Sequence, residues 1–139
     1  MLSGKILNLY VKRTHGAPME EVCEVTAVDG QGLRGDSNYG RSKRQVLLIE
    51  QETLGEFGLV TGQLKENAVV SGVVLAGLVP GSQIQAGEVV LEVTGDCAPC
   101  QYIEDLRPGL REAITGRRGT LCRVVTGGLM RVGDQVDVA

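Results

Sequence analysis

The 139-residue chain has few aromatic side chains and little histidine: it contains no Trp, one Phe, three Tyr and one His. With so few rings, we expect Val and Leu to fill most of the core. The formal net charge is −3, so the chain lacks the basic footprint of proteins that bind nucleic acid, and no nucleic-acid partner is expected. No apolar run approaches the ~20 residues of a transmembrane helix, and the N-terminus has no signal-peptide pattern. We therefore expect no membrane partner and a cytoplasmic location.

Cysteine is also scarce, with four residues, and two of these, Cys97 and Cys100, lie three positions apart. In a reducing cytoplasm such a close pair is more often reactive or metal-binding than a structural disulfide. Cys23 and Cys122 occur in apolar segments, where buried cysteine is common, and we expect both in the core.

Glycine is abundant, with 20 residues against four prolines, and this composition predicts many tight turns. Short segments of alternating or continuous apolar residues between these turns predict strands. The expected strands are 5–12, 22–28, 46–49, 67–72, 88–94, 120–125 and 135–138. Short helices are expected at 51–56 and 106–115, with Pro108 in the first turn of the second and Gly116 just past its end. Many strands with only short helices predict a mostly β fold, a barrel or a sandwich, in a single domain spanning 1–139.

Two segments, 80–90 and 128–136, resemble each other, because in each an apolar residue precedes a Gly-acid pair that opens a Val-rich strand. We interpret this as one hairpin turn used twice rather than as a solenoid repeat. No stretch of linker composition separates the two segments, which agrees with one domain.

The segment around Cys97 and Cys100 carries the most distinctive chemistry. It follows the apolar run 88–94, so a thiol there stands at the end of a strand and not within one. Pro99 fixes its own φ near −65° and biases Ala98 towards an extended form, and a stiff turn of this kind aims the next side chain, Cys100, outward. Cys97 lies closer to the strand and is expected to be partly packed.

Three functions for these thiols follow from chemistry alone. A Cys-x-x-Cys redox pair fits the spacing, although such a pair acts at the start of a helix and 101–105 is a weak helix start. A structural zinc site needs four ligands, and the only histidine, His15, lies far away in the sequence. A single thiolate that ligates a soft metal, or carries sulfur as a persulfide, needs one exposed cysteine and a means of holding the ligand.

A glycine-rich loop at 30–45 concentrates basic side chains that could hold an anionic ligand. They are those of Arg34, Arg41, Lys43 and Arg44. Arginine offers phosphate two parallel hydrogen bonds, and nearby glycines let backbone amides approach an anion. The same residues could also form a solvated basic loop. Further along the chain, Asn67 is either a turn residue or an amide that faces a ligand, and Asp96 is a proton acceptor or a turn former.

Seven short motifs, taken together, carry a family resemblance. In chain order they are Leu33-x-Gly35-Asp36, Arg44-Gln45-Val46-Leu47-Leu48-Ile49, Glu66-Asn67-x-Val69-Val70-x-Gly72, Gly87-Glu88-x-x-Leu91-Glu92-Val93-Thr94, Pro99-Cys100, Gly119-x-x-x-Arg123-Val124 and Val132-Gly133-Asp134-x-Val136. In order and spacing they resemble the MOSC domain, the C-terminal domain of molybdenum cofactor sulfurase. The resemblance runs from about Gly32 to the C-terminus.

The resemblance implies a MOSC-type β-barrel with two or more short helices, which agrees with the strand pattern. It also implies that Cys100 is the functional thiol, which carries sulfur or ligates the molybdenum of a pterin cofactor. In amidoxime-reducing relatives an Arg-x-Asn pattern helps to hold the cofactor, and Lys65-x-Asn67 occupies what looks like the same place. After the Gly-Asp pair, the chain has Ser37 and Asn38 where many relatives have Arg or His.

These observations predict a protein that handles the molybdenum cofactor (molybdopterin), by binding it or by carrying sulfur for its sulfuration. Cys100 is the expected catalytic thiol and metal ligand, and Cys97 is its helper. The expected cofactor-binding side chains are those of Lys65, Asn67, Arg41 and Arg44. The alternatives are a small molybdenum-dependent reductase of N-hydroxylated compounds, a Cys-x-x-Cys redox protein and a non-catalytic cofactor carrier. Expected partners are the cofactor or a pterin anion, a cysteine desulfurase or a molybdoenzyme. Pyridoxal phosphate is not expected, because no lysine stands in a suitable context for a Schiff base.

Overall fold

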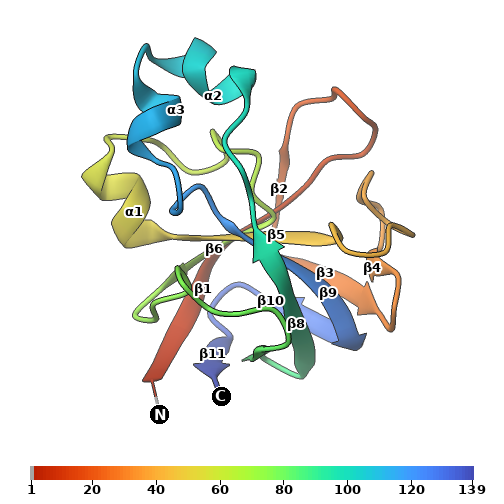
Figure 1. Ribbon diagram of the computed structural model, residues 1–139. Coiled ribbons are helices and arrows are strands. Elements are labelled where there is room, and N and C mark those ends of the chain that lie inside the picture. The colour runs from red at the N-terminus through yellow and green to blue at the C-terminus, as the bar shows by residue number, and fades with distance from the viewer. Residues whose placement is uncertain (1) are drawn as a thin grey trace.

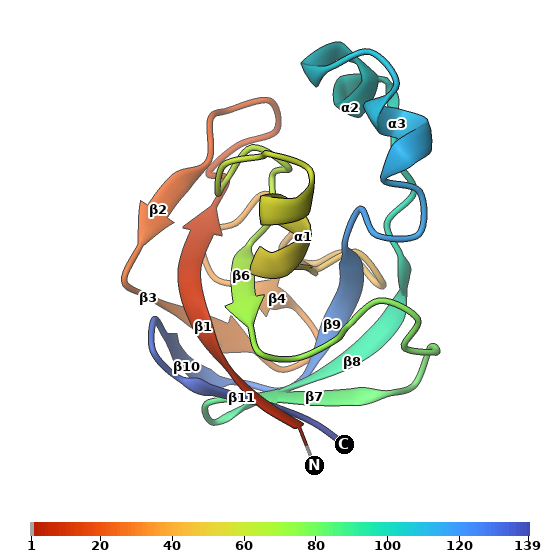
Figure 2. The same ribbon diagram turned by 90° about the vertical axis from the view of Figure 1, so that its left-hand side faces the viewer.

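The computed structural model describes residues 2–139, which form a closed β-barrel with short helices towards one end (Figure 1, Figure 2). Seven strands close the barrel, because β1 pairs with β6 on one side and with β11 on the other. In order around the barrel the strands are β1 (Leu2–Val11), β11 (Gln135–Val138), β7 (Gln83–Ala86), β8 (Val89–Asp96), β9 (Thr120–Thr126), β5 (Val46–Glu50) and β6 (Ala68–Ser71). The predicted mostly β barrel is confirmed.

A smaller sheet and three short helices complete the described part of the chain. β10 (Gly128–Arg131), β3 (Glu24–Val28) and β4 (Gly32–Leu33) pair in that order, and β2 (Glu20–Val22) extends the barrel sheet beside β1. The helices are α1 (Gln51–Glu56), α2 (Gln101–Leu106) and α3 (Leu110–Ala113). Figure 2 shows α2 and α3 together at the end of the molecule opposite to the two termini.

Alternating side chains fill the barrel interior. In β8, Val89, Leu91 and Val93 are fully buried while the residues between them are half-buried, and Ile84 and Ala86 of β7 show the same alternation. Each large aliphatic side chain contributes about 1.5–3 kcal/mol when it is fully buried. The interior is therefore a packed aliphatic core, as the scarcity of aromatic residues predicts.

A second apolar cluster attaches the helices to the barrel. Its buried members include Ile49, Leu54, Ile103, Leu110 and Ile114. α1 lies in the connection between β5 and β6, which pair in parallel and therefore need a long crossover. The cluster thus joins buried side chains of α1, α2 and α3 to those of β5 and β6.

The prediction of a single helix at 106–115 is wrong: α2 ends at Leu106, and within the predicted range only α3, Leu110–Ala113, is a separate helix. Pro108 holds Arg107 in an extended conformation, with φ −163° and ψ 128°, so α2 ends at the residue before it. Gly109 follows with φ +86°, a left-handed conformation that glycine adopts without steric cost, and α3 starts after it. Pro108 thus separates two helices instead of opening one. α2 itself occupies the stretch after Cys100 that is a weak helix start in the sequence.

Two further expectations are wrong because the chain passes from one sheet to the other. The segment 128–136 is no hairpin, since β10 pairs with β3 in the small sheet whereas β11 pairs with β1 and β7 in the barrel. The segment 80–90 does form a hairpin, between β7 and β8. Cys23 is exposed, because the chain bends there between β2 and β3 and interrupts the alternation that predicted burial. Cys122 is buried in β9, as expected.

We expect Ile103→Ala to lower the free energy of unfolding by about 2–5 kcal/mol. Ile103 is fully buried in the second apolar cluster, and the truncation leaves a cavity between α2 and the barrel, so amide exchange should rise selectively in α2 and α3. Val74→Ala removes an exposed side chain and is the matched control, with an expected change within about 0.5 kcal/mol. Urea unfolding and hydrogen exchange measure both variants. Equal effects of the two would contradict the role of the cluster.

Candidate functional site

The chain between β8 and α2 places its two cysteines differently. The backbone N–H of Cys97 donates to the carbonyl of Gly119 (2.9 Å), so Cys97 continues the pairing of β8 with β9, and it is only 5% exposed. Cys100 has an extended backbone, with φ −118° and ψ −177°, and directly precedes the first turn of α2. It is exposed, and both cysteines are free thiols. Ala98 and Pro99 thus separate a buried thiol from an exposed one.

A basic side chain reaches the buried cysteine. Nη2 of Arg44 lies 3.8 Å from Sγ of Cys97, and the same sulfur lies 4.0 Å from the carbonyl oxygen of Ala98. Arg44 belongs to the glycine-rich loop, which is far from the cysteines in the sequence. The fold therefore brings this loop against the cysteine segment, with the contact made at Cys97.

Tyr102 of α2 joins the cysteine segment to the turn that precedes β6. Its hydroxyl donates to the carbonyl of Gln63 (2.7 Å), and Nζ of Lys65 lies 4.3 Å from the centroid of its ring. Lys65 has φ +60°, a left-handed conformation that costs a non-glycine residue about 1–2 kcal/mol. The contact between the ammonium group and the ring is favourable. Lys65 consequently lies beside the helix that begins after Cys100.

The hydroxyl of Tyr102 responds to several charged groups. Burial raises its pKa, the positive charge of Arg118 lowers that pKa, and negative charges on Glu66 and Cys100 raise it. The charges that act on this hydroxyl therefore come from the segment before α2, from the turn before β6 and from the segment before β9, which lie far apart in the sequence.

Glu66 and Arg118 are two buried charged residues that the sequence did not single out as functional. Oε2 of Glu66 accepts a hydrogen bond from the N–H of Gly62 (2.6 Å), whereas its Oε1 is buried without a partner. Burial raises the pKa of this carboxyl, and nearby backbone N–H groups and the charge of Arg118 oppose the rise. Nε and Nη1 of Arg118 are buried without partners as well. The signal in the sequence is weak: a polar triplet before a strand, and an Arg-Arg pair flanked by glycines.

The amide of Asn67 is used by the protein itself. Its Oδ1 accepts from the backbone N–H of Leu47 (2.9 Å), and its Nδ2 donates to the carbonyl of Tyr10 (3.1 Å) and to Oδ1 of Asp36 (3.2 Å). The residue is buried at the point where β1, β5 and β6 meet. Asn67 therefore holds β1 and β5 together with the glycine-rich loop at 30–45, called the basic loop below. Its amide faces inward and not towards a ligand at the surface.

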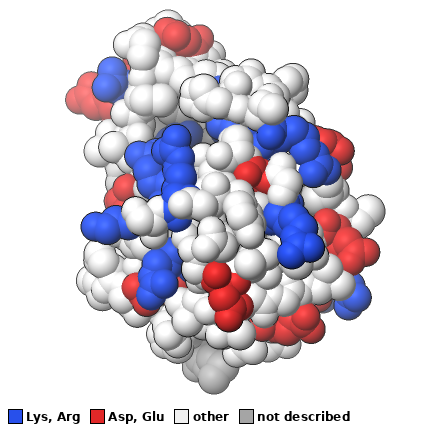
Figure 3. Space-filling model, turned by 90° about the vertical axis from the view of Figure 1, so that its right-hand side faces the viewer, with Lys and Arg blue, Asp and Glu red and all other residues white. Residues whose placement is uncertain are grey.

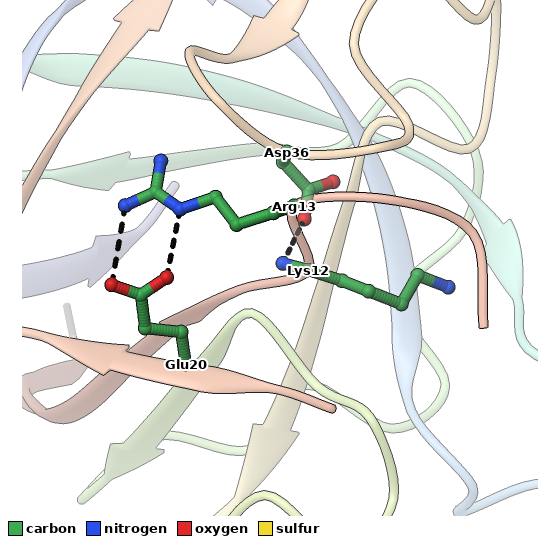
Figure 4. Close-up of polar contacts among 4 residues, drawn as sticks. All are labelled: Lys12, Arg13, Glu20 and Asp36. Carbon is green, nitrogen blue, oxygen red and sulfur yellow. Dashed lines mark hydrogen bonds and ion pairs between the residues drawn. The ribbon is translucent and has the colours of Figure 1, made fainter. Parts of the chain in front are cut away.

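Asp36 fixes the start of the basic loop to the end of β1. It is 5% exposed, its Oδ1 accepts from the backbone N–H of Lys12 (2.9 Å), and its Oδ2 accepts from that of Asn38 (3.1 Å). Figure 4 shows the contact with Lys12 next to the ion pair of Arg13 with Glu20, at 2.8 Å. The side chain of Lys12 extends away from that ion pair. The carboxylate of Asp36 thus serves as a structural acceptor.

A buried glutamine holds the other end of the loop. Nε2 of Gln45 donates to the carbonyls of Arg41 (2.6 Å) and Gly30 (3.0 Å), and its Oε1 accepts from the N–H of Val124 (2.8 Å). Arg41 is fixed through its backbone while its side chain is exposed, and no hydrogen bond or ion pair within residues 2–139 joins that side chain to a cysteine. Figure 3 shows Lys and Arg atoms in separate groups on this face, some of them around a hollow beneath the end that carries α2 and α3.

The structure places the predicted site residues differently. Lys65 lies over the ring of Tyr102 in α2, the helix that follows Cys100, and Arg44 lies beside Cys97. The side chain of Asn67 is buried and faces inward. Among the described residues, no three His, Cys, Asp or Glu side chains gather in a group that could hold a metal ion.

The model of the MOSC domain family matches residues 12–137. The chain belongs to the MOSC domain family. The family is linked to molybdenum cofactor sulfurase-like function and is associated with the molybdenum cofactor. No curated protein matches the chain. In the part of the chain that the structure describes, none of the helices has the length and apolar character needed to cross a membrane.

Several solved structures share the fold. The YuaD protein from Bacillus subtilis is 23% identical, with a TM-score of 0.82 over 99% of this chain and 98% of that one. YiiM from Geobacillus stearothermophilus is 21% identical, with a TM-score of 0.76 over 98% of this chain and 75% of that one. YiiM from Escherichia coli is 17% identical, with a TM-score of 0.71 over 100% of this chain and 70% of that one. At these identities the likeness establishes the barrel architecture.

We expect Glu66→Gln to stabilise the protein at neutral pH and to have little effect in acid. Burial raises the pKa of Glu66 in the folded state, so the folded protein holds this proton more tightly than the unfolded chain does. Stability is therefore lost as the pH rises above the ordinary carboxyl value of 4.5 and through the folded value. Glutamine keeps an acceptor for Gly62 but carries no charge.

Urea unfolding between about pH 4 and about pH 8 measures the difference between the variant and the wild type. Glu112→Gln changes an exposed glutamate on α3 and is the control. A Glu66→Gln effect of the same size at every pH would contradict the proton linkage.

Proposed function

We propose that this protein binds the molybdenum cofactor, or carries sulfur for its sulfuration, through the thiol of Cys100. The observation that carries the proposal is the exposure of Cys100 at the start of α2, while Cys97 is buried. Tyr102, two residues further on, has Lys65 over its ring and is acted on by the charge of Arg118. Membership of the MOSC family supports the same ligand. A thiolate suits a soft metal, and neighbouring cations suit the anionic part of a pterin cofactor.

The residues present fit this cofactor. Cys100 would ligate the metal, and the exposed ammonium of Lys65 would hold the anionic part of the pterin, with the buried charge of Arg118 adding to the attraction. The cations of the basic loop would attract the anion to this end of the barrel. Asn67 would act by fixing the turn that carries Lys65 and not by touching the cofactor. When bound, the cofactor supplies a redox-active molybdenum centre.

In the sulfur-carrying form of the proposal, the thiolate of Cys100 attacks the outer sulfur of a donor persulfide, R–S–SH. A new S–S bond forms at Cys100, the S–S bond of the donor breaks, and the donor leaves as its thiolate with the electron pair. The proton stays on the terminal sulfur, so Cys100 becomes a persulfide without net oxidation. A cysteine desulfurase is the class of donor, and the cofactor on a molybdoenzyme is the acceptor.

A Cys-x-x-Cys redox protein is the second candidate, and one observation favours it. α2 starts directly after Cys100, so one member of the pair lies at the start of a helix, where reactive cysteines of redox pairs are found. Cys97 is the buried member and Cys100 the exposed one. A reductase of N-hydroxylated compounds, by contrast, needs the same bound cofactor as the main proposal and differs from it only by turnover of such a substrate.

Protein expressed with molybdate and active cofactor synthesis tests the proposal. We expect molybdenum by elemental analysis together with pterin fluorescence, or a mass increase of one sulfur on Cys100. Cys100→Ser should lower this cargo by at least about tenfold, because it removes the ligand or carrier atom, whereas Cys97→Ser keeps much of it. Cys23→Ser is the matched control, because Cys23 is an exposed free cysteine between β2 and β3.

Wild-type protein without metal, pterin or added sulfur would overturn the proposal, and so would equal retention by Cys100→Ser. A disulfide between Cys97 and Cys100 that dithiothreitol reduces, in protein without cofactor or added sulfur, would select the redox candidate.

A further inference from the structure

The strand β10 has a partner on one side only. It pairs with β3 in the small sheet, and among residues 2–139 no strand pairs with its other side. β2 and β4 also stand at the end of a sheet, but they are three and two residues long, whereas β10 has four. An unpaired strand edge presents a row of N–H and C=O groups that can pair with a strand of another chain.

The register of β10 shows which of its backbone groups face this open edge. The N–H of Val132 donates to the carbonyl of Cys23 on the β3 side (3.0 Å), and in an antiparallel pair the bonded residues alternate with unbonded ones. Leu129 and Arg131 therefore direct their N–H groups away from β3. Leu129 is half-buried and Arg131 is exposed, so the edge lies at the surface.

Two acidic side chains occupy these outward N–H groups. Oε1 of Glu88 accepts from the N–H of Leu129, and Oδ2 of Asp134 accepts from the N–H of Arg131, each at 2.8 Å. The N–H of Asp134 also donates to the carbonyl of Arg131 (3.1 Å), so Asp134 bonds to both backbone groups of that residue. A residue on a neighbouring strand would occupy the same two groups.

Glu88 and Asp134 are the acids of the two Gly-acid pairs that recur in the sequence, Gly87-Glu88 and Gly133-Asp134. Only the first pair lies in a hairpin, but both acids have the same role at β10. Each carboxylate lies against a glycine: a Cβ on Gly128 would lie 2.8 Å from Oε1 of Glu88, and a Cβ on Gly87 would collide with the carboxylate of Asp134. The missing side chains leave room for both carboxylates at the edge.

The backbone of both acids is fixed by the barrel. Glu88 stands in the turn between β7 and β8, and the N–H of Gly87 before it donates to the carbonyl of Gln135 in β11 (3.0 Å). The carbonyl of Asp134 accepts from the N–H of Ile6 in β1 (2.9 Å). Strands of the barrel therefore place two carboxylates at an edge that belongs to the small sheet.

We propose that Glu88 and Asp134 block the open edge of β10 and so prevent a second copy of the protein from pairing with it. The excluded occupant is a second copy because antiparallel pairing of two β10 strands is two-fold symmetric. The outward N–H groups of each molecule then meet the outward carbonyls of the other. The carboxylates must leave before this pairing forms. The inference goes beyond the proposed function and does not depend on Cys100.

Size-exclusion chromatography with light scattering, over a range of concentrations of the full chain, tests the proposal. We expect Glu88→Ala/Asp134→Ala to form a species of twice the wild-type mass as its concentration rises, because both outward N–H groups lose their acceptors. Glu88→Gln/Asp134→Asn is the matched control. It removes the same two charges but keeps an acceptor oxygen at each position, so it should keep the wild-type mass.

Glu88→Ala alone leaves Asp134 in its turn with Arg131 and should associate in the same way at higher concentration. Circular dichroism confirms that each variant is folded. Hydrogen exchange identifies the edge that pairs: in the alanine variants the amide of Leu129 should exchange faster than in the wild type at low concentration, and should become protected in the doubled species.

Folded alanine variants that keep the wild-type mass at every concentration would overturn the proposal. Doubling of the Gln/Asn variant to the same extent would overturn it as well, because loss of charge would then explain the association. Doubling that leaves the amides of Leu129 and Arg131 unprotected would place the contact elsewhere and would also contradict it.

Discussion

The hydrogen bonds of buried Asn67 are the constraint on which both sides of the site depend. The side chain links Tyr10 at the end of β1, Leu47 of β5 and Asp36 at the start of the basic loop. Its backbone N–H and carbonyl also bond to Leu47 (2.8 Å) and Tyr10 (2.7 Å), where the strands begin to diverge. Each buried group left unpaired by its loss would cost about 1–3 kcal/mol. Because the turn carrying Lys65 directly precedes Asn67, one residue positions this turn and, through Asp36, the basic loop.

The helical end of the barrel adds the third side of the site. The apolar cluster attaches α1, α2 and α3 to the barrel, and the hydroxyl of Tyr102 donates to the carbonyl of Gln63 in the turn before β6. Between these attachments lies the short segment in which the N–H of Cys97 donates to the carbonyl of Gly119, just before β9, and Cys100 is exposed. The barrel, the two anchored loops and the short helix together leave the thiol of Cys100 exposed and that of Cys97 buried.

The local sequence pattern predicted the burial or exposure of a residue correctly where that environment depends on its neighbours in the chain. The alternation of Val89, Leu91 and Val93 predicted a half-buried strand, and Pro99 predicted the outward aim of Cys100. It failed where distant segments decide the outcome: the bend that exposes Cys23 follows from a change of sheet. The unpartnered charges of Glu66 and Arg118 arise only when three separate segments meet, so no spacing in the sequence reveals them. The cofactor contacts assigned from the sequence, the single domain and the cytoplasmic location stay predictions.

In the proposed function Cys100, and not Cys97, is the thiol that binds or carries the ligand. Alkylation of the native protein with limiting iodoacetamide, followed by peptide mapping, tests it most directly, because modification requires access to the sulfur. We expect Cys100 to be modified first and Cys97, which is 5% exposed and lies beside Arg44, to react only after unfolding in urea. Preferential modification of Cys97 in the folded protein, with Cys100 protected, would contradict the account.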